Sequence, residues 1–203
     1  MFTKIYKLVL PLIVVALLTS VSLQAQTVKK SMVAVYPAFS IAIGGGAQFP
    51  VGILGETYKS SFNAGLDINM KLNKETSLFL NATYFDMPRK PDATTPGPDA
   101  SIIAITVGPR YVFSSASVKA KFFMEAGIGA YIMNVKDYTT TGTPSVLIVG
   151  TSKTNMGANV GPGAVLPLSD SMDLLIKSKL HYMFTEGGSS SFISAFVGLD
   201  FKL

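Results

Sequence analysis

The segment Phe62–Leu72, FNAGLDINMKL, alternates between two kinds of side chain along its whole length. Every second residue, starting from the first phenylalanine, is apolar, and the residues between them are polar or small. A period of two places successive side chains on opposite faces of an extended chain. The segment therefore predicts a β-strand with one apolar face and one polar face, and the polar face carries Asp67 and Lys71.

The same alternation recurs along the rest of the chain and predicts eight strands of about ten residues each. Their predicted bounds are Ala38–Phe49, Phe62–Leu72, Ser77–Tyr84, Ile102–Phe113, Val118–Ile132, Thr154–Leu166, Met172–Phe184 and Ser191–Leu203. In all eight, the apolar face is free of charged residues. The opposite face holds Asp67, Lys71, Arg110, Lys119, Lys121, Glu125, Asp173, Lys177, Lys179, His181, Asp200 and Lys202.

Connection lengths indicate which of these faces is the inside. The second, fourth and sixth strands are followed by tight turns (Leu72–Thr76, Ser114–Ser117, Leu168–Ser171), whereas the first, third and fifth are followed by longer linkers (Pro50–Ser61, Phe85–Ser101, Met133–Lys153). Short turns at one end and long loops at the other are typical of outer-membrane barrels, in which the apolar face meets lipid and the interior is polar. The short linker Glu186–Ser190 is a partial exception.

Glycine and aromatic residues support the same interpretation. Glycines weaken a solvent-exposed strand, but on the charged face of a narrow barrel they leave room for long side chains. Tyrosine and phenylalanine near strand ends are typical of the two membrane interfaces. These aromatic residues are Phe39, Phe49, Phe62, Tyr84, Tyr111, Phe113, Tyr182, Phe184 and Phe201.

The N-terminus has the pattern of a secretory signal peptide. Lys4 and Lys7 precede the apolar run Leu8–Leu18, and Ala25 offers a cleavage site. An eleven-residue apolar run is too short to span a hydrocarbon layer about 30 Å thick as a helix, so a membrane anchor is the poorer alternative. We predict a cleaved signal peptide at 1–25, a short N-terminal segment at 26–37, and an all-β domain at 38–203. That domain is an eight-stranded antiparallel up-and-down transmembrane barrel.

Composition excludes several classes of site. The chain has no cysteine and one histidine, so it cannot form a disulfide, a thiolate zinc site or a multi-histidine metal site. We expect no cofactor. The 17 lysines and arginines against 12 acidic residues include two lysines of the predicted signal peptide, and no arginine-rich patch suggests nucleic acid.

Three stretches carry a resemblance to a known family. They are SIAIGGGAQFPVG (Ser40–Gly52), NVGPGAVLPLSDSMDLLIKSKLHYMF (Asn159–Phe184) and FISAFVGLDFKL (Phe192–Leu203). They resemble the small outer-membrane β-barrel family, whose transmembrane part is similar to the outer-membrane protein A and X barrels. The resemblance implies an outer-membrane location and a barrel fold, and it says little about a specific role.

The charged face allows two interpretations. A basic excess could line a path for water or ions, or the charges could pair and plug an interior that has little space beyond its side chains. We expect the plug. His181 could also serve as the base of a lipid-modifying enzyme, with Ser189, Ser190 or Ser191 as nucleophile and Glu186 orienting it, but no enzyme motif accompanies it. We therefore predict that the protein is not an enzyme.

The loops are then the place for function. We expect recognition, if any, by extracellular loops at 86–100 and 134–153. The apolar tetrad Val146–Val149 would extend a strand beyond the membrane as a hairpin or offer an edge to a partner. The leading hypothesis is a monomeric outer-membrane barrel with a structural or surface-interaction role. A small channel, a lipid-modifying enzyme and a soluble periplasmic lipid-binding barrel remain alternatives.

Two prolines stand inside predicted strands. Pro109 and Pro162 each follow a glycine, and proline cannot donate a hydrogen bond to a neighbouring strand. We predict β-bulges at Gly108-Pro109 and Gly161-Pro162.

Overall fold

The computed structural model describes residues 36, 38–91, 97–113, 120–139, 145–186 and 188–203. The predicted signal peptide lies outside these residues, as do nearly all of the segment 26–37 and Lys119.

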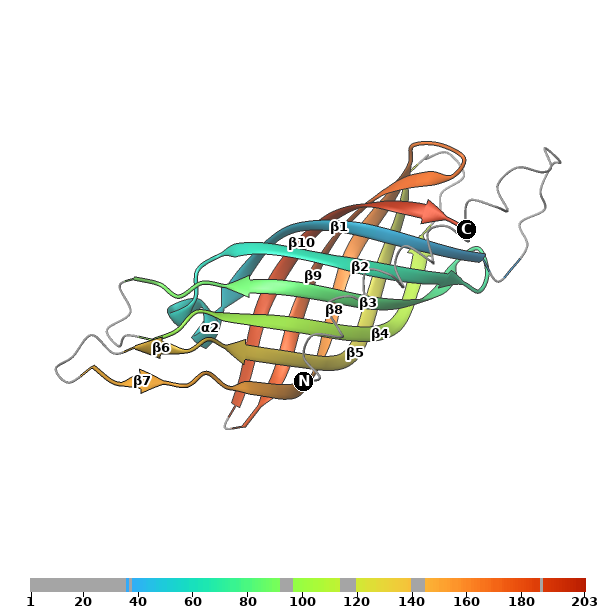
Figure 1. The fold of residues 1–203 in the computed structure, drawn as a ribbon. Coiled ribbons are helices and arrows are strands. Elements are labelled where there is room, and N and C mark those ends of the chain that lie inside the picture. The colour runs from blue at the N-terminus through green and yellow to red at the C-terminus, as the bar shows by residue number, and fades with distance from the viewer. Residues whose placement is uncertain (1–35, 37, 92–96, 114–119, 140–144, 187) are drawn as a thin grey trace, which may run out of the picture. The chain divides into compact units, whose positions relative to one another are not determined.

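Within the described residues, eight antiparallel strands form one closed barrel (Figure 1). The first and last strands pair with each other, and every other wall strand pairs with its neighbours along the chain. This confirms the predicted up-and-down barrel. The wall strands are β1 (Ala38–Val51), β2 (Ser61–Lys71), β3 (Thr76–Met87), β4 (Ala100–Phe113), β5 (Lys121–Val135), β8 (Ser152–Pro167), β9 (Met172–Thr185) and β10 (Gly188–Lys202).

The two ends of the barrel differ. At one end, which we call the short-turn end, brief connections join β2 to β3 and β8 to β9, and β4 ends and β5 begins there. The predicted turn at 114–117 lies outside the described residues. At the other, the long-loop end, lie the short helix α2 (Gly52–Thr57), the connection from β3 to β4, and a small hairpin of β6 (Tyr138–Thr139) and β7 (Leu147–Ile148). Most wall strands extend two or three residues farther toward the long-loop end than the alternation predicts, so both predicted loops begin and end inside strands.

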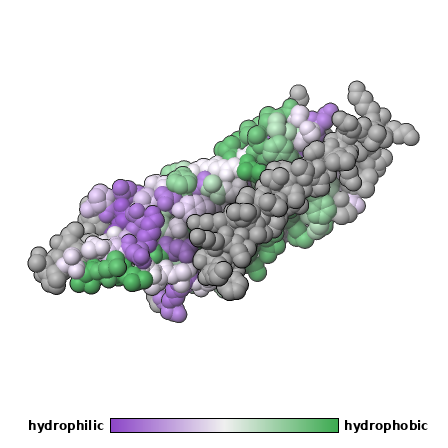
Figure 2. Space-filling model, viewed as in Figure 1, coloured by the Kyte–Doolittle hydropathy of each residue, from purple (hydrophilic) through white to green (hydrophobic). Residues whose placement is uncertain are grey.

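The wall has an apolar outer face. Every aromatic residue predicted to lie at a membrane interface is exposed, from Tyr84 at 37% to Phe184 at 57%. Figure 2 shows hydrophilic residues gathered toward the long-loop end, hydrophobic residues over the strands, and a separate hydrophobic patch on the β6–β7 hairpin. Among the described residues, no helix is both long enough and apolar enough to cross a membrane.

Neither proline produces a bulge, so that prediction was wrong. Val107 pairs with Ile128 and Arg110 with Glu125 in one continuous register, and no extra residue is inserted between them. The same holds on both sides of Gly161-Pro162. The glycine before each proline lets the neighbouring backbone approach closely, because a Cβ at Gly108 or Gly161 would overlap a carbonyl oxygen of the next strand. Gly108 and Pro109 of β4 therefore have no pair on β5, and Gly161 and Pro162 of β8 have none on β9, but the register continues unchanged beyond them.

Aromatic rings occupy much of the interior. Phe79, Phe123 and Tyr131 are almost completely buried, and each lies over a glycine of another strand. A Cβ on Gly163 would overlap the ring of Phe123, and one on Gly157 would come within 2.6 Å of the Tyr131 ring. The interior glycines therefore make room for rings as well as for ionic side chains.

An apolar cluster fills the interior at the long-loop end. Leu54 of α2 and Tyr58, which follows it, are buried among inward-facing side chains of the strands. The segment is held there by backbone hydrogen bonds from Lys59 to Pro88 and from Lys90 to Thr57. The strand residues of this cluster are Phe85, Met87, Ala100, Ile102, Ala104, Tyr131, Met183 and Phe192.

Replacing Gly163 with alanine is expected to destabilise the barrel by about 1–3 kcal/mol, because the new methyl group must displace a buried ring. The control is Gly188→Ala, where a Cβ has nothing within 4 Å. Urea unfolding in phospholipid vesicles, followed by the gel shift between folded and unfolded chains, measures the difference. Equal midpoints for the two variants would contradict the packing described here.

Candidate functional site

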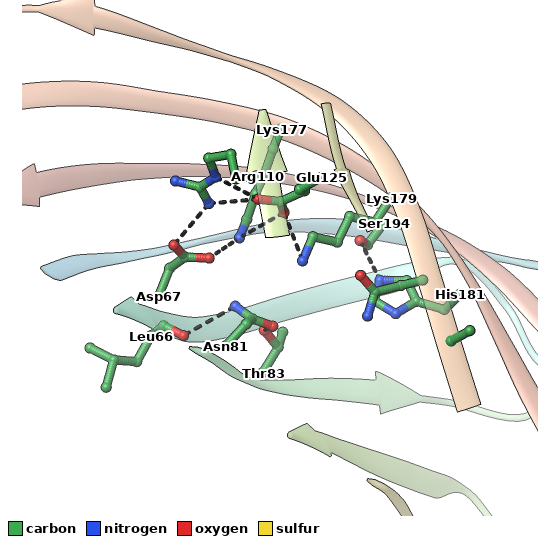
Figure 3. Close-up of polar contacts among 12 residues, drawn as sticks. Leu66, Asp67, Asn81, Thr83, Arg110, Glu125, Lys177, Lys179, His181 and Ser194 are labelled. Atoms are coloured by element: carbon green, nitrogen blue, oxygen red, sulfur yellow. Dashed lines mark hydrogen bonds and ion pairs between the residues drawn. The ribbon is translucent and has the colours of Figure 1, made fainter. Parts of the chain in front are cut away.

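Five buried charged side chains meet in the middle of the barrel, and we call them the ionic core (Figure 3). Arg110 lies between two carboxylates: its Nη2 is 3.0 Å from Asp67 Oδ1 and 2.6 Å from Glu125 Oε2. Its Nε also donates a hydrogen bond to Glu125 Oε2 at 2.7 Å. The remaining members, Lys177 and Lys179, complete a connected network around the same two carboxylates.

The two lysines contact the carboxylates from β9. Lys177 Nζ pairs with Asp67 Oδ2 and lies 3.6 Å from Glu125 Oε1. Lys179 Nζ lies 2.7 Å from the same oxygen of Glu125. The side chains come from β2, β4, β5 and β9, so the network joins strands that are far apart in the closed sheet. Because removing charges from water is costly, only this mutual pairing makes their burial tolerable.

Aromatic rings surround the cations. Arg110 Cζ lies 4.4 Å from the centre of the Phe123 ring, and Lys179 Nζ lies 4.2 Å from that of Phe79. Lys177 Nζ lies 5.1 Å from the Phe196 ring. A ring face attracts a cation, and the attraction is stronger where water is excluded. The five side chains of the ionic core carry three positive and two negative charges. The rings therefore stabilise the one positive charge in excess.

His181 lies beside the ionic core on the side of the long-loop end. Its Nδ1 is 3.0 Å from the Tyr131 hydroxyl, its Nε2 is 3.0 Å from Ser194 Oγ, and its ring stacks on Phe192 with centroids 4.5 Å apart. It is 1% exposed. His181 therefore contacts polar Ser194 on one side and Tyr131 and Phe192 of the apolar cluster on the other.

The hypothetical enzyme arrangement around His181 is not assembled. Its hydroxyl partners are Tyr131 and Ser194 rather than Ser189, Ser190 or Ser191. Glu186 lies on the surface and pairs with Lys153 at 2.5 Å, and this partner lowers the pKa of the Glu186 carboxyl. The lipid-modifying mechanism therefore lacks its nucleophile and its orienting group.

A second polar layer lies near the short-turn end. Lys202 Nζ is 2.6 Å from Asp173 Oδ1, and Ser40 donates a hydrogen bond to Asp200. Lys71 is half-buried and Lys121 is exposed, and both line a cavity of about 40 Å³ next to Arg110. A second cavity, of about 10 Å³, adjoins Lys179 and His181. Each has room for little more than ordered water.

Eight of the twelve predicted interior residues are therefore buried: Asp67, Arg110, Glu125, Asp173, Lys177, Lys179, His181 and Asp200. The aromatic interior residues and the buried amides of Asn63, Asn81, Asn155 and Asn159 were not singled out. Those on β2, β5 and β10 share strand parity with the charges, and those on β3 and β8 alternate with outward-facing residues. Strand parity was therefore the signal that could have identified them. Within the described part of the chain, no three acidic or histidine side chains are placed to hold a metal ion.

The loops show one further ordered feature. The apolar tetrad takes part in a hairpin, because Leu147 pairs with Thr139 and Ile148 with Tyr138. A hairpin therefore forms, but the predicted extension of a wall strand was wrong, because β6 and β7 make a separate small sheet. Beside α2, burial raises the pKa of the Tyr58 hydroxyl, partly opposed by Arg89.

No protein-family model matches the chain, and no curated protein is significantly similar to it. Solved structures match along most of its length. Neisserial surface protein A has a TM-score of 0.61 at 15% identity, over 82% of this chain and 97% of that one. A major outer membrane protein from Thermus thermophilus has a TM-score of 0.60 at 13% identity, over 82% and 100%. The N-terminal barrel domain of Pseudomonas aeruginosa OprF has a TM-score of 0.51 at 14% identity, over 82% and 98%.

The class of protein that the closed sheet, apolar outer face and charged interior define is the outer-membrane β-barrel. Backbone groups cannot remain unpaired in hydrocarbon, and closure removes the exposed edges. Within that class, the chain has the fold of the small eight-stranded barrels, as its sequence resemblance implied. At these identities the likeness is one of fold.

Replacing Glu125 with glutamine is expected to destabilise the barrel by about 3–5 kcal/mol, because it leaves three buried cations around a single carboxylate. The comparison is Glu186→Gln, which removes an exposed partner of Lys153 and should change stability little. Urea titration in phospholipid vesicles measures both variants. An unchanged midpoint for Glu125→Gln would show that the network is not needed for stability.

Proposed function

We propose that the protein is a monomeric, non-enzymatic outer-membrane barrel whose interior is plugged and whose role is exerted at its long-loop end. In this proposal residues 1–25 direct export and are removed. The long-loop end faces the cell exterior, because barrels of this class have short periplasmic turns and longer extracellular loops.

The plug is supported by two consecutive layers across the interior. The ionic core blocks the middle of the barrel, and the apolar cluster capped by Leu54 and Tyr58 blocks the long-loop end. The two cavities that adjoin the ionic core are about 40 Å³ and 10 Å³. A channel would need continuous hydrated space, so we expect no conductance steps when the full chain is inserted in a planar bilayer.

The single observation that carries a surface role is the β6–β7 hairpin. Val146, Leu147, Ile148 and Val149 are 51%, 63%, 40% and 70% exposed at the long-loop end. Exposed apolar residues gathered in one place are typical of interaction surfaces. Neisserial surface protein A, which shares the fold, is described as a surface protein. We propose that this hairpin contacts apolar surfaces outside the cell, as a structural or adhesive element.

Cells of a Gram-negative host that display the full chain are expected to be retained on polystyrene more than cells without it. The double substitution Leu147→Ser and Val149→Ser should reduce retention to the level of those empty cells, because it removes the most exposed apolar side chains of the hairpin.

The matched control is Ile53→Ser, which removes a side chain of 70% exposure from α2 at the same end. It should leave most of the retention intact, and surface amounts of all variants are compared by gel shift. Full retention by the hairpin variant would contradict a role for the hairpin.

A further inference from the structure

The outer wall carries a groove of about 380 Å³, far larger than the interior cavities near the ionic core. It crosses β8, β9 and β10 in the half of the barrel nearer the short-turn end. Its volume lies in the range of about 300–1,000 Å³ that is common for small-molecule sites.

The register of the sheet explains the groove. Small outward-facing residues follow one another across three strands: Pro162 on β8, Ser178 on β9 and Ala195 on β10, of which the last two are direct partners. A row of larger residues flanks them toward the short-turn end, with Ile176 paired to Val197.

On the opposite side, Val160, Leu180 and Ile193 form the next row of larger side chains, and each is 40–46% exposed. Three adjacent strands give the small row a length of roughly 10 Å at a spacing of about 4.8 Å.

The groove lies beside an interruption in the pairing of β8 with β9. Val160 pairs with Leu180 and Gly163 with Lys177, but among the described pairs none joins Gly161 or Pro162 to β9. Pro162 has no N–H to donate there. Lys177 and Phe196, whose side chains belong to the interior, are also among the residues that line the groove.

We infer that this groove binds an acyl chain of a membrane phospholipid. The groove is continuous with the lipid-facing surface: its flanking residues Phe122, Ile176 and Val197 are 55%, 41% and 49% exposed. Its outward-facing lining carries no charge, so it suits a hydrocarbon chain. A bound chain would cover the stretch of β8 beside Pro162 that has no pair on β9.

A second copy of the protein is the less suitable occupant, because a stable interface between two proteins buries about 1,200–2,000 Å² and this groove spans only three strands. The inference rests on the lipid-facing wall and is independent of the proposed surface role.

Native mass spectrometry of the purified full chain, released from detergent micelles containing palmitoyl-oleoyl phosphatidylethanolamine, tests the inference. The wild-type barrel should retain one phospholipid. Ser178→Phe, which fills the small row, should reduce the lipid-bound fraction severalfold.

The control is Ala82→Phe, which places the same ring on the lipid-facing side of β3 across the barrel and should retain lipid as the wild type does. Ala82 and Ser178 are each the seventh residue of a strand that starts at the short-turn end, so the two substitutions lie the same number of residues from that end. The gel shift checks that each variant is folded, and Ala195→Leu replaces Ser178→Phe if that variant does not fold.

Equal lipid retention by the wild type and the groove variant would overturn the inference. So would a loss of lipid in Ala82→Phe as large as that in Ser178→Phe, which would indicate a general effect of the added ring. A dimer mass that disappears in Ser178→Phe would assign the groove to a second copy instead.

Discussion

The pairing of Arg110 with two buried carboxylates is the interaction on which the rest of the structure depends. The three cations and two carboxylates of the ionic core can leave water only if each finds a partner there. Their strands must therefore close into one wall, since an open sheet would expose the charges to lipid and leave edge groups unpaired. The arrangement inverts that of a soluble barrel, because its polar groups gather inside and its apolar side chains face outward.

This constraint determines where function can lie. Eight strands enclose a narrow interior, in which the ionic core, aromatic rings and apolar cluster lie. In the proposed account these layers plug the interior, and His181 is held between Tyr131 and Ser194. The surfaces that remain are the long-loop end, where the β6–β7 hairpin exposes apolar side chains, and the lipid-facing wall, where a row of small residues forms a groove.

The sequence was sufficient for the strands and for the side of the wall on which charges lie, because both follow from a period of two that any β-strand must obey. It could not predict which charges pair. Asp67 and Arg110 are 43 residues apart and do not lie on neighbouring strands, so their contact depends on closure and side-chain packing. The predicted bulges were wrong because Gly108 and Gly161 allow a close approach of strands that residue type alone does not reveal.

The orientation of the two faces is tested most directly by separating the membranes of a Gram-negative host that expresses the full chain and running the outer-membrane fraction on a gel with and without boiling. The account predicts that the chain is in this fraction and that its unboiled band migrates differently from the boiled one, because a closed barrel resists detergent until it is heated. Release into the soluble periplasm, with identical bands in both samples, would contradict it.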